Sequence, residues 1–198
     1  MTEALNKNKE QELTGSQVTG NPVNANAEKQ NPMTKVKLEK VTLNIGTGKD
    51  QAKLERAMML IKHITGVDPV KTITNKRIAA WGLRPGLPIG CKLTLRGKNA
   101  KELLARLLES KENTLKGSWF DERGNISFGI TEYIDIPGVK YDTKIGMMGF
   151  QVCITLTKPG YRIKYRKIMK RKIPHKHLIT KDQAKEYMKE EFGVKIEE

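Results

Sequence analysis

The 198-residue sequence has only two cysteines, 6% aromatic residues and no long hydrophobic run. Cys91 and Cys153 both lie within apolar alternations, so we expect two buried free thiols rather than a disulfide framework. No stretch of 18 apolar residues could span a membrane, and no basic amphipathic helix with a Trp/Leu face indicates a membrane surface. The start of the chain lacks the charged and then apolar pattern of a signal peptide. We therefore expect a cytoplasmic protein with no membrane partner.

Acidic residues are also scarce. The chain has 22 Asp and Glu against 37 Lys and Arg, which gives a formal net charge of +15 and a pI near 9.8. Such an excess of one sign repels itself in a compact state, and a polyanionic partner removes the repulsion. The composition therefore favours a nucleic-acid-binding protein.

Motifs for nucleotide binding are incomplete. Gly46 and Gly48 follow a predicted strand, but Gln51 stands where a dinucleotide fingerprint requires a third glycine, and Asp50 follows Lys49 where a phosphate-binding loop requires Ser or Thr. The two glycines then form a tight turn, or the helix start and Lys49 hold a phosphate of a larger nucleic acid. We expect no nucleotide cofactor.

Catalytic and metal motifs are equally weak. Cys91 as a nucleophile needs a nearby histidine, and a core thiol is the simpler interpretation. His175 and His177 lie among bases that repel a cation, and no Cys or acid completes a metal-ligand set. We therefore expect no catalytic residue, no metal and no cofactor.

Composition divides the chain into three parts. Residues 1–32 are rich in Asn, Gln, Glu, Thr and Ala with no aromatic residue, which predicts a disordered tail. Residues 33–157 contain the periodic segments of one folded domain. Residues 158–198 form a basic C-terminal extension that ends in a short helix packed on the domain.

The periodic segments alternate between strands and helices. The strand pattern near residues 36–45 changes phase, which predicts a bulge at Glu39 or Lys40. Further strands are predicted at 70–74, 89–96, 126–136 and 150–157, and residues 113–125 are predicted to be a connection. A helix at 50–65 has the apolar stripe Leu54, Ala57, Met58, Ile61 and Ile64 and ends at Gly66. Two more helices start at predicted capping boxes, Asn99–Glu102 and Thr180–Gln183.

This order predicts an α+β fold with a single antiparallel sheet, helices packed on one face and the other face open for RNA. The open face is expected to be polar, rich in threonine and free of acids, which suits an RNA backbone and its 2′-hydroxyls. Its predicted residues are Thr42, Asn44, Lys92, Thr94, Arg96, Gln151, Thr155 and Thr157.

A long basic loop joins two of the strands. Residues 69–101 hold eight bases and no acid, and the segment from Asn75 to Pro88 is too irregular for an element and too long for a tight turn. Loops on a rigid scaffold often make contacts, so we expect this loop to reach a partner. Trp81 within it either stacks on RNA or, as we favour, anchors the loop to its own protein.

The C-terminal extension is the second basic segment. Residues 158–177 carry nine bases and no acid. The guanidinium groups of Arg162 and Arg166 suit phosphates. Tyr161 and Tyr165 alternate with these bases, and each could stack on a nucleotide or pack on the sheet.

Three segments resemble one known family: residues 38–48 (LEKVTLNIGTG), 89–97 (IGCKLTLRG) and 120–125 (FDERGN). The family is the large-subunit ribosomal protein, number five of that subunit, that binds 5S ribosomal RNA in the central protuberance. The basic extension and final helix resemble its archaeal branch. Val67 departs from the family, which often has Gln there, so Val67 is left out of the RNA contacts.

The resemblance implies a non-catalytic protein of the cytoplasmic ribosome. Its expected partners are 5S rRNA, large-subunit rRNA, P-site tRNA, a neighbouring 5S-associated ribosomal protein and a small-subunit protein across an intersubunit bridge. Residues matching Asn44 and Thr94 are notable 5S RNA contacts in the family. The expected RNA-binding residues are Thr42, Asn44, Gly46, Lys49, Thr74, Lys76, Arg77, Arg84, Lys92, Thr94, Arg96, Arg162, Lys164 and Arg166. The expected tRNA-contacting residues are Lys76, Arg77, Trp81 and Arg84.

Two alternatives have distinct signatures. An RNA-modifying enzyme that uses Cys91 requires a thiol of lowered pKa. A general single-strand RNA binder requires exposed aromatic side chains along its polar face, and few are expected there.

Overall fold

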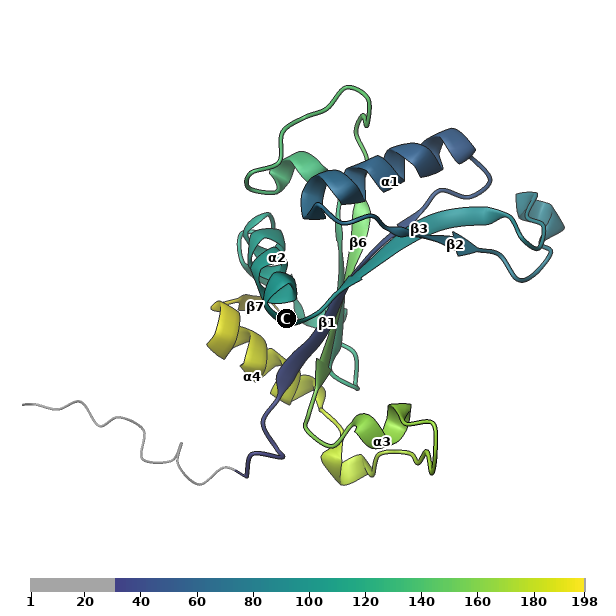
Figure 1. Cartoon of the computed structure of the whole chain (residues 1–198). Coiled ribbons are helices and arrows are strands. Elements are labelled where there is room, and N and C mark those ends of the chain that lie inside the picture. The colour runs from purple at the N-terminus through teal and green to yellow at the C-terminus, as the bar shows by residue number, and fades with distance from the viewer. Residues whose placement is uncertain (1–30, 198) are drawn as a thin grey trace, which may run out of the picture. The chain divides into compact units, whose positions relative to one another are not determined.

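A computed structural model describes residues 31–197, and the folded unit within them is built on a five-stranded antiparallel sheet (Figure 1). The strand order is β2-β3-β1-β6-β5. The strands are β1 (Lys37–Gly46), β2 (Val70–Ile73), β3 (Pro88–Leu95), β5 (Asn125–Ile130) and β6 (Phe150–Thr157). The predicted α+β fold with an antiparallel sheet is confirmed. The expected N-terminal tail falls almost entirely on residues 1–30, which lie outside the described residues.

The central strand β1 has the predicted bulge. Leu38 pairs with Leu156 and Lys40 with Thr155, and the register shifts between these two pairs. The shift turns Val41, Leu43 and Ile45 toward the core, where each is at most 4% exposed. A change of phase in the hydrophobic alternation is thus the signal of a bulge.

Helices α1 (Gln51–Thr65), α2 (Gly97–Glu109) and α4 (Lys181–Phe192) cover one face of the sheet (Figure 1). Their apolar sides form one core with the inward residues of the strands. In α1, Leu60 is fully buried while Met58 is only half-buried, so the predicted stripe was wrong at that position. Lys101 on α2 and Glu191 on α4 form an exposed ion pair with a 3.1 Å Nζ–Oε2 distance.

One of the two predicted capping boxes is present. The Thr180 hydroxyl accepts from the Gln183 amide, and the Gln183 side chain accepts from the Thr180 amide, both at 3.4 Å. The Asn99–Glu102 box was wrong, because α2 begins at Gly97, with Arg96 at the N-cap and no side-chain cap. Strand β3 passes into the helix through Gly97 at φ 68°, so Asn99 already lies in the first helical turn.

A second, two-stranded parallel sheet was not predicted. It pairs β4 (Thr114–Lys116) with β7 (Lys195–Glu197), within segments expected to be a connection and the end of the chain. Each strand has three residues, too few for a periodic pattern to show. The pairing places the C-terminal end of the described chain beside the segment that follows α2. Among the described helices, none has the length and apolarity needed to span a membrane.

Candidate nucleic-acid interface

The face of the sheet opposite the helices carries rows of polar side chains that run across the strands. In one row, Asn44 of β1 lies between Lys92 of β3 and Gln151 of β6. In the next, Thr42 lies between Thr94 and Cys153. The hydroxyls of Thr42 and Thr94 are 3.4 Å apart. The predicted open-face residues that lie on these two rows are thus brought together.

This face is accessible and contains no acidic side chain in its rows. Lys92 and Gln151 are exposed, and Thr42, Asn44 and Thr94 are half-buried by their neighbours within the sheet. Arg96, which follows β3, is also exposed. Half-buried amides and hydroxyls beside flexible cations can hydrogen-bond to sugars and bind phosphates.

The face is wider than the sequence analysis predicted. Asn125, Ser127 and Gly129 of β5 pair with Thr155, Cys153 and Gln151 of β6, and all three are exposed. They alternate with buried Ile126, Phe128 and Ile130, so the signal was present in the sequence. Lys40, opposite Thr155, joins the same face because it alternates with Thr42 and Asn44 along β1.

The two cysteines lie on opposite faces of the sheet and are free thiols. Cys91 is fully buried in the core, as predicted, and burial raises the pKa of its thiol to about 11. A thiol of raised pKa is a poor nucleophile, which contradicts the alternative of a Cys91 enzyme. Cys153 was wrongly predicted to be buried: it is half-buried on the open face, between Thr42 and Ser127.

The tight turn between β1 and α1 accounts for the presence of Gly46 and Gly48, so a nucleotide-binding role is not needed to explain them. The amides of Thr47 and Gly48 both donate to the Ile89 carbonyl, at 2.9 and 3.1 Å, and Gly48 has φ 67°. Lys49 is exposed, and its side chain extends to the backbone of Gly82 in the loop between β2 and β3. Lys49 thereby adds its charge to that loop.

The loop between β2 and β3, residues 74–87, is an ordered small hairpin. Thr74 and Leu87 are joined at its base, Ile78 and Leu83 are paired by two backbone hydrogen bonds, and a 3-10 turn, η2 (Ala79–Trp81), forms the tip. The expectation of an irregular loop was wrong because these pairings are too short to leave a pattern. We call this segment the hairpin loop.

Side chains of the hairpin loop divide into anchors and exposed groups. Leu83 is buried and holds the loop, whereas Lys76, Arg77 and Arg84 are exposed. Trp81 is 68% exposed, so our preference for an anchoring Trp81 was wrong. Thr74 is 7% exposed, and its hydroxyl is buried without a hydrogen-bond partner, which does not suit a direct contact with RNA.

One base of the C-terminal extension, Lys158, joins the start of the extension to the start of α4. Lys158 is only 5% exposed, and its ammonium donates to the Leu178 carbonyl at 3.3 Å and to Gln183 Oε1 at 2.7 Å. Burial lowers the pKa of this ammonium. Lys158 therefore supports the start of α4 and is not one of the solvent-facing bases.

The tyrosines of the extension also differ. Tyr161 packs against His177 and donates to its carbonyl at 3.3 Å, so it is a structural residue. Tyr165 is 56% exposed at the end of the short helix α3 (Arg162–Tyr165), and its hydroxyl donates to Glu39 Oε2 at 3.4 Å. Burial, and then the nearby Glu39 carboxylate, raise the pKa of Tyr165. Arg162 and Lys164 are exposed, and Arg166 is half-buried.

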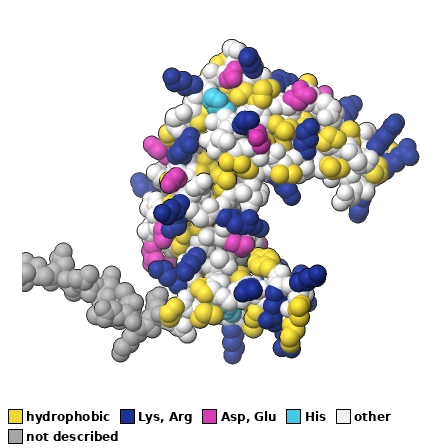
Figure 2. All heavy atoms as spheres, in the orientation of Figure 1, with side chains coloured by type: hydrophobic (Ala, Val, Ile, Leu, Met, Phe, Trp, Pro, Cys, Tyr) yellow, Lys and Arg dark blue, Asp and Glu magenta, His cyan; other side chains and the backbone are white. Residues whose placement is uncertain are grey.

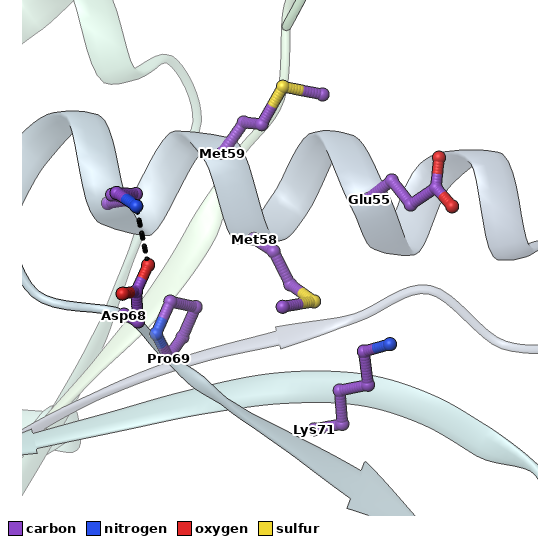
Figure 3. A pocket seen from close by; sticks show the side chains of 7 residues that line it. Glu55, Met58, Met59, Asp68, Pro69 and Lys71 are labelled. Atoms are coloured by element: carbon purple, nitrogen blue, oxygen red, sulfur yellow. Dashed lines mark ion pairs between the residues drawn. The ribbon is translucent and has the colours of Figure 1, made fainter.

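A groove of about 300 Å³ lies between α1 and the start of β2 (Figure 3). Met58, Met59 and Pro69 form its apolar part, and charges of both signs surround it. Lys62 and Asp68 pair across one end at 2.9 Å. Mixed charges do not suit a polyanion, and nowhere in residues 31–197 do three potential metal-binding side chains gather.

Comparison with known proteins agrees with this architecture. A model of the ribosomal L5P family C-terminus matches residues 88–192, and a model of ribosomal protein L5 matches residues 31–84. A large ribosomal subunit protein uL5 from Sulfurisphaera tokodaii is 47% identical over 169 residues, 85% of this chain and 96% of the relative. The uL5 proteins of Sulfolobus acidocaldarius and Nitrosopumilus maritimus are 48% and 47% identical over 86% and 84% of this chain, and 96% of each relative is covered.

The matches span the sheet, the hairpin loop, the extension and α4, and the relatives named here are archaeal. Proteins of this family are structural, RNA-binding components of the large subunit of the cytoplasmic ribosome and are not enzymes. The chain belongs to the ribosomal protein L5 family, as the three sequence segments predicted.

Proposed function

We propose that this protein binds 5S rRNA through the open face of its sheet and helps attach it to the large subunit in the central protuberance. The observation that carries the proposal is the pair of polar rows without acids on this face, where Asn44 and Thr94 lie on adjacent rows with Lys92 beside them. The sheet holds these groups in fixed register, so a folded RNA can be recognised by shape.

Affinity and recognition come from different residues in this account. Lys92, Arg96 and the exposed bases of the extension neutralise phosphates and supply most of the affinity. Asn44, Thr42 and Thr94 make local hydrogen bonds that fix the register of the RNA. The contact set is therefore Thr42, Asn44, Gly46, Lys49, Lys92, Thr94, Arg96, Arg162, Lys164 and Arg166, with the buried side chain of Thr74 left out.

The hairpin loop serves a second RNA contact in this proposal. Its exposed Lys76, Arg77, Arg84 and Trp81 reach large-subunit rRNA and the P-site tRNA. The Lys and Arg side chains neutralise RNA phosphates, and the exposed indole of Trp81 can stack on a nucleotide. A neighbouring 5S-associated protein and a small-subunit protein across an intersubunit bridge are further partners that the family resemblance suggests.

Salt-dependent binding to 5S rRNA tests the sheet contact. Arg96→Ala is expected to weaken binding and to flatten the plot of log affinity against log salt by about 0.7 to 0.9 for one lost phosphate contact. Asn44→Ala is expected to cost about 1–3 kcal/mol of binding free energy while leaving the slope unchanged, because it removes hydrogen bonds and no charge.

The matched control is Lys189→Ala, which removes an exposed base from α4 on the helix-covered side. It is expected to change neither quantity. If Arg96→Ala and Lys189→Ala give the same slope as the wild type, the sheet face does not bind RNA phosphates and the proposal fails.

A further inference from the structure

Residues 162–172 form a small closed loop, which we call the C-terminal knuckle. It starts with α3, and the Arg171 amide donates to the Ile163 carbonyl at 3.3 Å and so closes the loop. Within it the Arg166 Nε donates to the Met169 carbonyl at 2.8 Å. The guanidinium of Arg166 therefore fixes the turn that contains Met169.

The apex of the knuckle is apolar and faces solvent. Ile168 is 78% exposed and Met169 is 67% exposed, which with Trp81 are the most exposed large apolar side chains in residues 31–197. Met169 also has φ 52°, a left-handed conformation that non-glycine residues rarely adopt. The fold thus holds two apolar side chains outward and gains no core packing from them, which points to a partner.

The charge around this apex identifies the partner. Seven of the eleven residues from 162 to 172 are Lys or Arg, and none is acidic. A protein or lipid surface that only covers apolar groups does not need so dense a ring of cations, whereas RNA offers phosphates around unstacked bases. Charge complementarity therefore favours RNA.

The position of the knuckle supports the same partner. Tyr165 joins it to Glu39, the bulge region of β1 at one end of the open face. The hairpin loop projects near the other end, and Figure 2 shows a hollowed surface between the two projections with Lys and Arg side chains at both. RNA that lies on the sheet can reach the knuckle without a change in the fold.

We propose that Ile168 and Met169 form an apolar wedge that packs against unstacked nucleobases of structured ribosomal RNA. The surrounding Lys and Arg side chains then bind the flanking phosphates. Apolar side chains of nucleic-acid-binding proteins can insert between bases in this way. The inference rests on the RNA binding proposed above, and it adds residues that contribute through apolar contact rather than charge.

The test compares the full-length wild type with Ile168→Ala/Met169→Ala. Binding to 5S rRNA and to protein-free large-subunit rRNA is measured over a range of salt, together with chemical probing of nucleotide flexibility. The double variant is expected to lose about tenfold or more in affinity for the RNA that the wedge contacts. Its salt slope is expected to stay the same, because no charge is removed.

Chemical probing provides the second readout. The wild type is expected to raise the reactivity of one or a few nucleotides that it unstacks, and the double variant is expected to abolish that increase. Lys167→Ala/Lys170→Ala is expected to flatten the dependence of log affinity on log salt and to keep the increase in nucleotide reactivity. Met147→Ala, which removes an apolar side chain 56% exposed outside the knuckle, serves as the control without effect.

The outcomes separate this proposal from the preceding one. Wild-type binding to 5S rRNA with no affinity or probing change in the double variant overturns the wedge and leaves the proposed function standing. A wedge effect on large-subunit rRNA without any 5S rRNA binding supports the wedge and overturns the 5S assignment. Normal RNA binding by the double variant with failed incorporation into reconstituted large subunits identifies a protein partner and also overturns the wedge.

Discussion

At the residue scale, the side of the sheet that a residue occupies decides its chemistry. Cys91 on β3 and Cys153 on β6 lie on strands that flank the central strand β1, yet one faces the core and the other the open face. Cys91 has no polar partner to stabilise a thiolate, so burial alone raises its pKa.

The raised pKa of Cys91 makes stability depend on pH above neutrality. Its pKa is about 11 in the folded chain against 9.0 for the unperturbed thiol, so the unfolded state releases its proton first as pH rises. The contribution of the protonated thiol to the free energy of unfolding is complete below pH 9 and is lost between pH 9 and 11, on the order of 3 kcal/mol. Denaturant unfolding should show this extra loss in the wild type relative to Cys91→Ala. Parallel pH profiles for the two proteins would contradict the assignment.

Single residues were predicted well where a pattern fixed their side of the sheet. Asn44 and Thr94 follow directly from alternation in long strands. Lys158 and Thr74 could not be predicted, because their burial depends on contacts with residues distant in sequence or on the closing of the hairpin loop. Composition alone treats every lysine in a basic segment as exposed.

At the element scale, the C-terminal extension shows how a basic segment can be ordered without a large core of its own. Lys158 reaches Leu178 and Gln183, which couples the end of β6 to the start of α4. The capping box of Thr180 and Gln183 lies at the same point.

Lys158→Met should therefore destabilise the extension more than the sheet. It removes the side-chain donor to the Leu178 carbonyl and one of the two donors to Gln183 Oε1, at a cost of about 1–3 kcal/mol. Hydrogen exchange should show faster opening of α4 with little change in β1 and β3. Lys176→Met, at an exposed base of the same extension, is the control. Equal protection of α4 in both variants would show that Lys158 does not hold the helix.

The hairpin loop should be separable from the sheet in function. Replacement of residues 75–87 by a short turn removes Lys76, Arg77, Arg84 and Trp81 and leaves the rows of the open face intact. We expect normal binding to free 5S rRNA and weaker tRNA binding at the P site of assembled ribosomes, measured by filter binding. Loss of 5S rRNA binding would show that the loop, not the sheet, carries that contact.

Long elements were predicted from the sequence and short ones were not. The three long helices and strands β1, β3, β5 and β6 have periodic patterns that extend over several residues. The predicted continuation of β5 to residue 136 was wrong, because the strand ends at Ile130 and a 3-10 turn, η4 (Tyr133–Asp135), follows. β4, β7 and the inner pairing of the hairpin loop are too short for a period, and their partners are set by the tertiary fold. The side of the sheet that the residues of β1 and β3 occupy was predictable for the same reason.

At the scale of the whole folded unit, the account depends on one asymmetry. Helices bury one face of the sheet, and the other face remains polar, without acids in the rows around Thr42 and Asn44, and accessible between two basic projections. Cys153 is a native reporter of the open face, and Cys91 is an internal reference on the buried face.

The most direct measurement is the alkylation rate of Cys153 in the presence and absence of 5S rRNA, at a pH where Cys91 does not react. The account predicts that saturating 5S rRNA slows alkylation of Cys153 strongly, since the RNA covers Thr42 and Thr94 beside it. An unrelated structured RNA of similar length should protect it less. A Cys153 alkylation rate that bound 5S rRNA leaves unchanged would contradict the claim that the open sheet face is the RNA-binding surface.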